Sequence, residues 1–427
     1  MIAIVGAGAA GLATAIFAAR RGVRGPIVAF DGAARLGAKI LVSGGARCNV
    51  TNRVVIEQDF AGGNRSVVRG ILRAFPADKA VAFFREIGVA LHEEAGGRLF
   101  PDSNRARTVL DALLGEARRC GVDLRAGQRV LRVARDERGF RLETSREEVE
   151  ATRVVLATGG LSLPKTGSDG GGYAMAVALG HRLVPQTPAL VPLVLEGDFH
   201  ADLAGVSHEA ELVVHVGGER PVVRRGSLLW THFGVSGPVV LDVSRFWHRA
   251  LEEGREARVS ASLLPGRSFV EIENALLAQG AANPQGQVKG ALSAWLPASV
   301  AAAVPGRLGV CGNTRLGQLT REDRRRLVRG LLEWPLPIKG SRGYDYAEVT
   351  AGGVPLAEIE PGTMASRRCP GLYLVGEILD VDGRIGGFNF QWAWSTGWVA
   401  AGALAGVTTR AARQEEAGVV GSRPGEG

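Results

Sequence analysis

The first residues whose spacing suggests chemistry are three glycines, Gly6, Gly8 and Gly11. They follow an apolar stretch, residues 2–5, and open a helical pattern, residues 9–21. In such a strand–turn–helix, the first glycine permits a tight turn, the second lets the backbone approach a pyrophosphate, and the third lets helix and strand pack closely. The helix N-terminus then offers free N–H groups to the phosphates. Glycine triplets arise by chance in a chain with 60 glycines, but the position of this one predicts a dinucleotide site.

A carboxylate follows where the ribose of such a ligand would need it. Asp31 ends the next predicted strand, residues 26–31, and lies 20 residues after Gly11. At this spacing a carboxylate accepts hydrogen bonds from the ribose hydroxyls of adenosine. No arginine follows Asp31 directly, which disfavours a ligand with a 2′-phosphate.

Three more glycine-rich segments, residues 39–52, 157–160 and 376–389, lie far along the chain. Apolar runs typical of buried parallel strands, residues 154–158 and 372–375, lead into the last two. Open α/β sheets bind ligands at the carboxyl ends of their strands. A long bipartite cofactor that crosses the sheet would explain several such loops, so the pattern predicts FAD rather than NAD alone.

The C-terminal segment has a specific use in a flavin site. Glu377 and Asp380 compete as the carboxylate that hydrogen-bonds the ribityl hydroxyls, and the position of Glu377 after its strand favours Glu377. Asp380 and Asp382 can hold the turn of the loop. A helix that starts near Asn389 can aim its N-terminal dipole at the pyrimidine edge of a flavin, where negative charge gathers on reduction.

The segment 39–52 supplies polar groups for the same ligand. Arg47 and Asn49 can hydrogen-bond the flavin ring or the phosphates, and Lys39 can neutralise phosphate charge. Cys48 has two interpretations: a flavin-facing thiol whose pKa Arg47 lowers, or a small buried side chain. With no partner cysteine nearby in sequence, the buried side chain is favoured.

His232 is the candidate catalytic residue, because a histidine in a loop between two strand patterns can relay protons. A structural hydrogen-bonding role is the more frequent one for a lone histidine. Trp392, Trp394 and Trp398 fall on the predicted C-terminal helix, and we expect at least two of them in the core. The residues predicted to bind the cofactor are Gly6, Ala7, Gly8, Ala10, Gly11, Asp31, Lys39, Ser43, Gly44, Arg47, Cys48, Asn49, Val130, Thr158, Gly159, Gly376, Glu377, Asp380, Gly386, Gly387, Asn389 and Phe390.

The elements that must position these residues alternate between strands and helices as far as about residue 190. Beyond it, strand signals at residues 191–195, 211–216, 221–223 and 238–243 are separated by glycine turns, which predicts a small antiparallel sheet or barrel. Helical patterns follow at 269–277, 288–295 and 322–332, two of them behind the capping boxes Ser268-x-x-Glu271 and Thr320-x-x-Asp323. The α/β pattern returns after residue 340, with a strand at 372–375 and a helix at 389–404.

This order predicts a nucleotide-binding domain that an inserted domain interrupts. The expected parts are 1–190 and 341–407 for the FAD-binding domain, 191–340 for an inserted, barrel-like and helical substrate domain, and 408–427 for a flexible tail. The four cysteines are widely spaced and none forms a Cys-x-x-Cys pair, so no structural zinc site or other metal site is predicted.

Long motifs along the chain resemble those of one bacterial family. They are Gly6-x-Gly8-x-x-Gly11, Ser43-Gly-Gly-Ala-Arg47-Cys48-Asn49-Val-Thr51-Asn52, Thr158-Gly159-Gly160, Thr231-His232-Phe233-Gly234-Val-Ser236-Gly237-Pro238, Thr350-Ala-Gly352-Gly353-Val354 and Gly371-Leu-Tyr-Leu-Val-Gly376-Glu377-Ile-Leu-Asp380. The family comprises FAD-dependent, NAD(P)-linked oxidoreductases and includes aminoacetone oxidase and a dehydro-bile-acid reductase. The resemblance covers residues 1 to about 406.

The resemblance implies an α/β fold: a Rossmann-like FAD-binding domain of the two-dinucleotide-binding type around a central parallel sheet, with an inserted β-rich domain and a small helical subdomain. This sequence departs from the family pattern at Ala46, Asp31 and Phe388, where the family usually has Gly, Glu and Tyr. The lost tyrosine hydroxyl puts in doubt any phenol-based proton donor at position 388.

Charge and composition limit the partners. The formal net charge is +8, the pI is about 9.8, and only five of the 51 basic residues are lysines. An anionic cofactor and a general arginine bias explain this balance better than nucleic acid, since no basic stripe with interleaved aromatics stands out. We expect a small-molecule substrate, no nucleic-acid partner, no membrane segment and a cytoplasmic location, because the sequence opens on a strand without a signal peptide. The oligomeric state is open.

The predicted function is a FAD-dependent oxidoreductase that transfers a hydride between flavin N5 and a small organic substrate. NAD(P)H or oxygen would recycle the flavin, and without a second G-x-G-x-x-G the nicotinamide would have to enter the substrate cleft. An amine-type oxidase and a NAD(P)H-dependent reductase of an unsaturated carbonyl are both compatible. Two alternatives from other classes are a flavoprotein that binds or modifies nucleic acid and a flavin-free NAD dehydrogenase.

Overall fold

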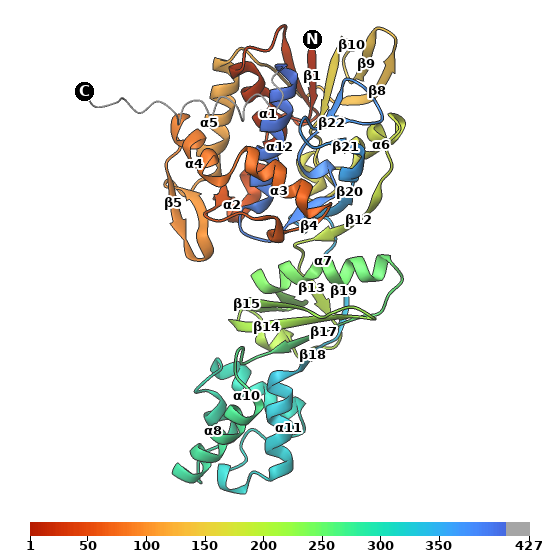
Figure 1. Ribbon diagram of the computed structural model, residues 1–427. Coiled ribbons are helices and arrows are strands. Elements are labelled where there is room, and N and C mark those ends of the chain that lie inside the picture. The colour runs from red at the N-terminus through yellow and green to blue at the C-terminus, as the bar shows by residue number, and fades with distance from the viewer. Residues whose placement is uncertain (407–427) are drawn as a thin grey trace, which may run out of the picture. The chain divides into compact units, whose positions relative to one another are not determined.

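The computed structural model describes residues 1–406 (Figure 1). The tail predicted for 408–427, and residue 407 of the preceding part, lie outside the described residues. Two compact units make up the chain: Met1–Gln186 together with the chain from Glu348 onward, and Thr187–Ala347. None of the described helices combines the length and apolar composition needed to span a bilayer.

A seven-stranded sheet forms the centre of the first unit, in the order β21-β22-β23-β11-β1-β2-β7. The five strands from β23 to β7 pair in parallel, while β21 and β22 are antiparallel. This confirms the predicted α/β class with a central parallel sheet. The bounds are β1 (Ile2–Val5), β2 (Ile27–Asp31), β7 (Asp123–Ala126), β11 (Arg153–Leu156), β21 (Ile359–Glu360), β22 (Ala365–Ser366) and β23 (Leu372–Leu374).

Two helices from opposite ends of the chain pack side by side in this unit, α1 (Ala9–Arg20) and α12 (Phe388–Leu404) (Figure 1). Gly397 allows the close approach, because a Cβ there would lie 3.1 Å from the Ala13 side chain. Trp392 and Trp394 are each 1% exposed, which confirms that two of the three tryptophans are in the core. The other helices are α2 (Ala38–Ala46), α3 (Arg65–Ala74), α4 (Ala77–Glu86), α5 (Ala106–Arg119) and α6 (Gly171–Ala178).

Small antiparallel sheets complete the first unit and connect distant segments. One pairs β4 (Phe60–Gly62) with β24 (Val381–Gly383), and so joins residues about 320 apart in sequence. Another has the order β3-β6-β5, and a third the order β10-β9-β8. The bounds are β3 (Thr51–Asn52), β5 (Leu91–Glu94), β6 (Arg98–Pro101), β8 (Val130–Asp136), β9 (Gly139–Thr144) and β10 (Glu148–Ala151), and β12 (Val184–Ala189) pairs with β20 (Val349–Gly353).

The second unit holds an antiparallel seven-stranded sheet in the order β18-β17-β14-β15-β16-β13-β19, followed by a group of helices, as the predicted β-rich insert with a helical part requires. Its strands are β13 (Leu193–Leu195), β14 (Ser207–Val216), β15 (Val222–Thr231), β16 (Gly234–Ser236), β17 (Ala257–Ser262), β18 (Trp334–Leu336) and β19 (Ile338–Ser341). Its helices are α7 (Pro238–Glu252), α8 (Phe269–Ala282), α9 (Val288–Leu292), α10 (Ala298–Arg307) and α11 (Arg321–Leu332).

One predicted strand is wrong: residues 238–243 begin helix α7. Pro238 occupies the first helical turn, where its missing N–H costs nothing. The helix buries Val239, Val243 and Trp247 at helical spacing, against β14 and β15. Over six residues an apolar run fits either element, and only the longer pattern shows the helical period.

The two predicted capping boxes differ in the structure. Ser268 and Glu271 form the full reciprocal box, since each side chain accepts from the other residue's backbone N–H. The Thr320 side chain accepts from the Asp323 N–H, but the Asp323 carboxylate receives the Thr320 hydroxyl at 2.9 Å. The aspartate side chain is one methylene shorter than glutamate, which accounts for the incomplete box.

Candidate cofactor site

In the glycine loop after β1, neighbouring atoms leave no room for a side chain at Gly6 or Gly11, whereas the space at Gly8 is open. A Cβ on Gly6, whose φ is +99°, would lie 2.5 Å from the Ala157 carbonyl oxygen, and a Cβ on Gly11 would lie 1.9 Å from the Gly6 oxygen. A Cβ on Gly8 would meet nothing within 4 Å. Gly8 is the N-cap of α1, so the open space lies at a helix N-terminus. Room beside free backbone N–H groups fits a pyrophosphate.

Asp31, at the carboxyl end of β2, holds this loop in place. Its carboxylate accepts from the N–H groups of Ala7 at 2.9 Å and Ala33 at 2.8 Å. Burial raises the pKa of the Asp31 carboxyl, although these hydrogen bonds and the nearby Arg129 oppose the change. Because each carboxylate oxygen accepts more than one hydrogen bond, Asp31 can hold the loop and still receive ribose hydroxyls.

Buried hydroxyls without partners lie after β11. Among the described residues, Thr158 Oγ1 and Ser168 Oγ are shielded from solvent and hydrogen-bond no protein group. A Cβ on Gly159, between them in sequence, would lie 2.7 Å from Ser168 Oγ. Buried polar groups are normally satisfied, so these atoms fit a site that a polar ligand completes.

The Glu377 carboxylate is the centre of a network that joins three distant segments. It accepts from Lys39 Nζ at 2.7 Å, Ser162 Oγ at 2.9 Å and the Thr350 N–H at 2.8 Å. The structure thus gives Lys39 an ion-pair partner that the sequence did not suggest, while its role toward phosphate stays a prediction. Ser162 and Thr350 were missed, although Thr350 opens one of the long motifs.

The end of α2 and the residues after it adopt backbone conformations that most residues avoid. The helix is interrupted at Ser43, Gly44 and Gly45. Ala46 and Cys48 both have φ +64°, in the left-handed region. Such residues cost of order 1 kcal/mol each and concentrate at functional sites.

Protein groups hold the Arg47 guanidinium, and the Cys48 thiol is buried. The Arg47 guanidinium pairs with Glu94 at 2.6 Å and lies 4.1 Å from the centroid of the Phe100 ring. Cys48 is fully buried, and burial raises its pKa to about 12. The thiol therefore stays protonated, in agreement with a small buried side chain rather than an activated thiolate. Flavin contacts of Arg47 and Cys48 stay predictions.

Asn49 meets the C-terminal loop. Its Oδ1 atom is buried and has no hydrogen-bond partner in the described part of the chain. A Cβ on Gly387 would lie 2.9 Å from that oxygen and 2.6 Å from the Thr51 carbonyl. Gly387, with φ +91°, is the N-cap of α12, which begins one residue before the predicted Asn389. Asn389 itself holds the loop by bonding the N–H and the carbonyl of Gly383, at 2.8 and 2.9 Å.

Of the other residues predicted to bind the cofactor, three pack against neighbouring residues of the first unit and one holds its own loop. Gly376 meets the first glycine loop, because a Cβ there would lie 2.7 Å from the Ala10 side chain. Phe390 stacks on Trp394 at 5.5 Å, and Val130 is buried in β8. Asp380 bonds the Val354 carbonyl through its N–H and so helps to hold its loop.

His232 is exposed in the turn between β15 and β16, in the second unit. Its catalytic role stays a prediction.

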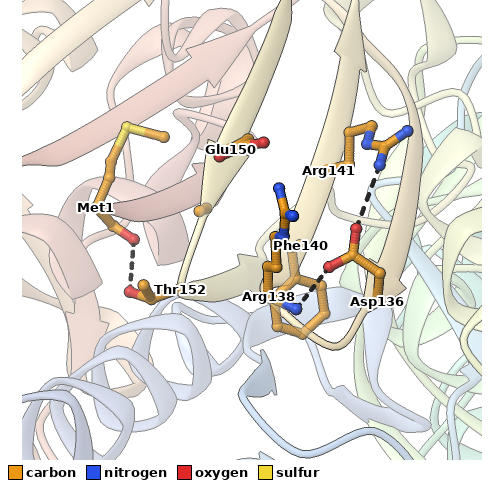
Figure 2. Close-up of a pocket in the computed structure, with 9 residues that line it drawn as sticks. Met1, Asp136, Arg138, Phe140, Arg141, Glu150 and Thr152 are labelled. Atoms are coloured by element: carbon orange, nitrogen blue, oxygen red, sulfur yellow. Dashed lines mark hydrogen bonds and ion pairs between the residues drawn. The ribbon is translucent and has the colours of Figure 1, made fainter.

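A separate cavity of about 230 Å³ does not belong to this site. It lies between Met1, Thr152 and the β8–β9 hairpin, with Asp136, Arg138 and Arg141 on its wall (Figure 2). Met1 and Thr152 precede β1 and β11, so the cavity is at the amino ends of the parallel strands. The glycine loops follow the carboxyl ends of the same strands, at the opposite edge of the sheet.

Known proteins match this chain over nearly its whole length. Residues 1–403 match the family model described as HI0933-like protein Rossmann domain. The chain is 36% identical over 401 residues to the ribosomal RNA dihydrouridine synthase of Escherichia coli, covering 93% of this chain and 96% of that protein. It is 33% identical to the 3-dehydro-bile acid delta(4,6)-reductase of Clostridium scindens, covering 95% and 98%, and 32% identical to the ribosomal RNA dihydrouridine synthase of Haemophilus influenzae, covering 93% and 96%.

Proposed function

The chain belongs to the HI0933-like Rossmann-domain family of FAD-binding oxidoreductases, and from this premise we propose that it reduces a carbon–carbon double bond conjugated to a carbonyl group. The relatives are named for different substrates, a uracil base in RNA and a steroid acid. Both names describe the saturation of a double bond of this kind. The shared reaction class supports a reductase over the amine-type oxidase that the sequence left open.

The proposed placement of FAD rests on three features of the first unit. We assign the pyrophosphate to the open N-terminus of α1 at Gly8, and the ribityl chain to Glu377. The flavin ring is assigned to the space beside Asn49 and Gly387. The observation that carries this assignment is the unsatisfied, buried Asn49 Oδ1 next to the N-terminus of α12. When bound and reduced by NAD(P)H, the flavin would supply the hydride.

The chain's own groups tune this chemistry. The first turn of α12 carries no acidic residue, so its partial positive charge is uncompensated by a side chain. That charge favours negative charge at the pyrimidine edge of a flavin. We also propose that the insert 191–340 is the substrate domain, and that His232 on its exposed turn supplies the proton that accompanies hydride addition.

The experiment that tests this function is anaerobic flavin bleaching. We expect NADH or NADPH to bleach the bound flavin, and an enone or a uridine-containing RNA to restore the colour. Bleaching by an amine alone, with peroxide formed in air, would replace the reductase with an oxidase. A preparation that takes up no FAD would overturn the proposal.

RNA is the second candidate substrate, and a specific observation favours it. The net charge of +8 and the two relatives named for ribosomal RNA go together, since phosphate binding requires cations. The sequence alone favoured a small molecule, as the bile-acid relative does. Reoxidation of the reduced enzyme by uridine-rich RNA, but not by a 3-oxo-4,6-diene steroid, would decide for RNA.

A further inference from the structure

Helix α3 presents a row of arginines to solvent. Arg65, Arg69 and Arg73 are four residues apart and all are exposed, in a row that flanks the side of the helix where Val68, Ile71 and Leu72 are buried. Four residues of helix rise about 6 Å, so the three guanidinium groups form a line along the helix. Gly70, also exposed, adds no side chain beside this row, and the space around it is open. The α3 face is therefore basic.

At the N-terminus of α3 the charge does not serve the helix, although Arg73 in the last turn suits the dipole. The N-terminus of a helix favours acidic side chains and disfavours cations. The first turn of α3 has no acidic residue and begins with Arg65, although its N-cap Asn64 is well formed. Helices α8 and α11, by contrast, have Glu271 and Asp323 in their first turns. A local preference that is broken without a structural gain is typical of a functional surface.

The arginine row is also incompletely neutralised. Arg69 bonds Glu57, with its Nε at 2.8 Å from Oε1. No ion pair of Arg65 or Arg73 is found within residues 1–406. One carboxylate against three guanidinium groups leaves a net positive face.

The α3 face is connected to the loop that we assign to the flavin. Strand β4 leads into α3 and pairs with β24, which leads into the Gly386–Gly387 turn. Arg384 in that loop pairs with Asp59 at 2.8 Å and lies 4.1 Å from the centroid of the Phe388 ring. Asp59 and the Arg69 partner Glu57 belong to the same short helical turn.

We propose that the exposed face of α3, with Arg65, Arg69 and Arg73, binds the phosphate backbone of a single-stranded RNA substrate. This inference rests on RNA being the substrate of the proposed reductase. Arginine suits phosphate through its planar, always charged donor fork, and a line of such groups fits a polyanion with regularly spaced phosphates. The face has no aromatic side chain, so it holds the strand without reading its bases.

The test is RNA binding by the FAD-loaded full chain, with a fluorescein-labelled oligouridylate followed by anisotropy over a range of salt concentrations. Arg65→Gln, Arg69→Gln and Arg73→Gln together should weaken binding about tenfold or more. They should also lower the slope of log affinity against log salt by about 2, since each phosphate contact on a single strand contributes roughly 0.7. The triple lysine variant should keep most of the slope, because it keeps the charge.

A matched control removes the same charge elsewhere. Arg132, Arg135 and Arg138 are exposed on the β8–β9 hairpin, whose turn lies near the amino ends of the parallel strands, and their change to Gln should leave the slope nearly unchanged. Should the α3 triple variant lose FAD, Arg65→Gln with Arg73→Gln replaces it, with an expected slope change of about 1.4.

The outcomes distinguish the role of the α3 face from the choice of RNA as the substrate. Loss of affinity in the α3 variant alone supports the proposal. Equal loss in the control variant, or none in the α3 variant, overturns the α3 face while RNA remains the substrate. A wild-type protein that binds no oligouridylate even at low salt overturns both the face and RNA as the substrate, but not reduction of an enone.

Discussion

The two ends of the candidate FAD site are built in different ways. At the adenosine end, Gly6, Gly8 and Gly11 follow one another in sequence, and hard contacts with neighbouring backbone fix two of them. At the flavin end, Asn49 meets Gly387 from more than 330 residues away, through a loop with left-handed Ala46 and Cys48. The first end is therefore a local motif, and the second exists only once the chain has folded. Variants at each end should separate packing from ligand binding.

The largest effect is expected from Gly11→Ala, set against Gly8→Ala. The new Cβ at residue 11 would overlap the Gly6 carbonyl at 1.9 Å, so this variant should lose about 3 kcal/mol or more of stability and with it the FAD site. Gly8→Ala meets no protein atom and should fold normally but bind FAD weakly. Thermal unfolding of the apoprotein and FAD titration check both. A Gly8→Ala apoprotein as unstable as Gly11→Ala would contradict the assignment of Gly8 to the ligand alone.

At the flavin end, Asn49→Ala should weaken FAD about tenfold, which is ~1.4 kcal/mol. Removing the amide oxygen should cost the apoprotein little stability, because Oδ1 makes no hydrogen bond to a protein group. Asn52→Ala is the matched control, since the Asn52 side chain donates to the Gly96 and Gly386 carbonyls and should lower the melting temperature. Flavin fluorescence quenching measures the affinity. An Asn49 variant with wild-type affinity would remove that residue from the flavin site.

Between the two ends, the interaction of Lys39 with Glu377 should contribute about 1 kcal/mol or less to the free energy of unfolding of the apoprotein. The Coulomb attraction is weakened because the side chains are 27% and 19% exposed. A double-mutant cycle of Lys39→Met and Glu377→Gln, followed by urea unfolding, gives this value. In the FAD-loaded protein, Glu377→Gln should also weaken binding. Strict additivity in the cycle would show that the ion pair contributes nothing.

The smallest effect is a gain. Ala46→Gly should stabilise the protein by a few tenths to about 1 kcal/mol, because glycine adopts φ +64° without steric cost. Position 46 carries glycine in the family that the sequence resembles, so the change should also preserve FAD binding. Denaturant unfolding is precise enough for this difference. A loss of stability would mean that the alanine methyl packs better than its backbone conformation costs.

Where the sequence prediction was wrong or incomplete, the missing information lay outside the local window. The stretch 238–243 fits a strand by itself, and it becomes helix α7 because Trp247 and Ala250 extend one buried face at helical spacing. Lys39 shows no sign in sequence of its partner Glu377, 338 residues away. Arg47 likewise gives no hint that Glu94 and Phe100 hold its guanidinium group.

The sequence by itself determined the Rossmann-like class, the position of the glycine loop and the carboxylate at Asp31. These follow from short-range rules, since residues within one strand–turn–helix share a single local geometry. Only the tertiary structure decided which groups are already bonded and which are left for a ligand. Asn389 turned out to hold its own loop, whereas Asn49 Oδ1 stayed unsatisfied. Hydrogen-bond satisfaction depends on every segment that reaches the site, and here those segments come from both ends of the chain.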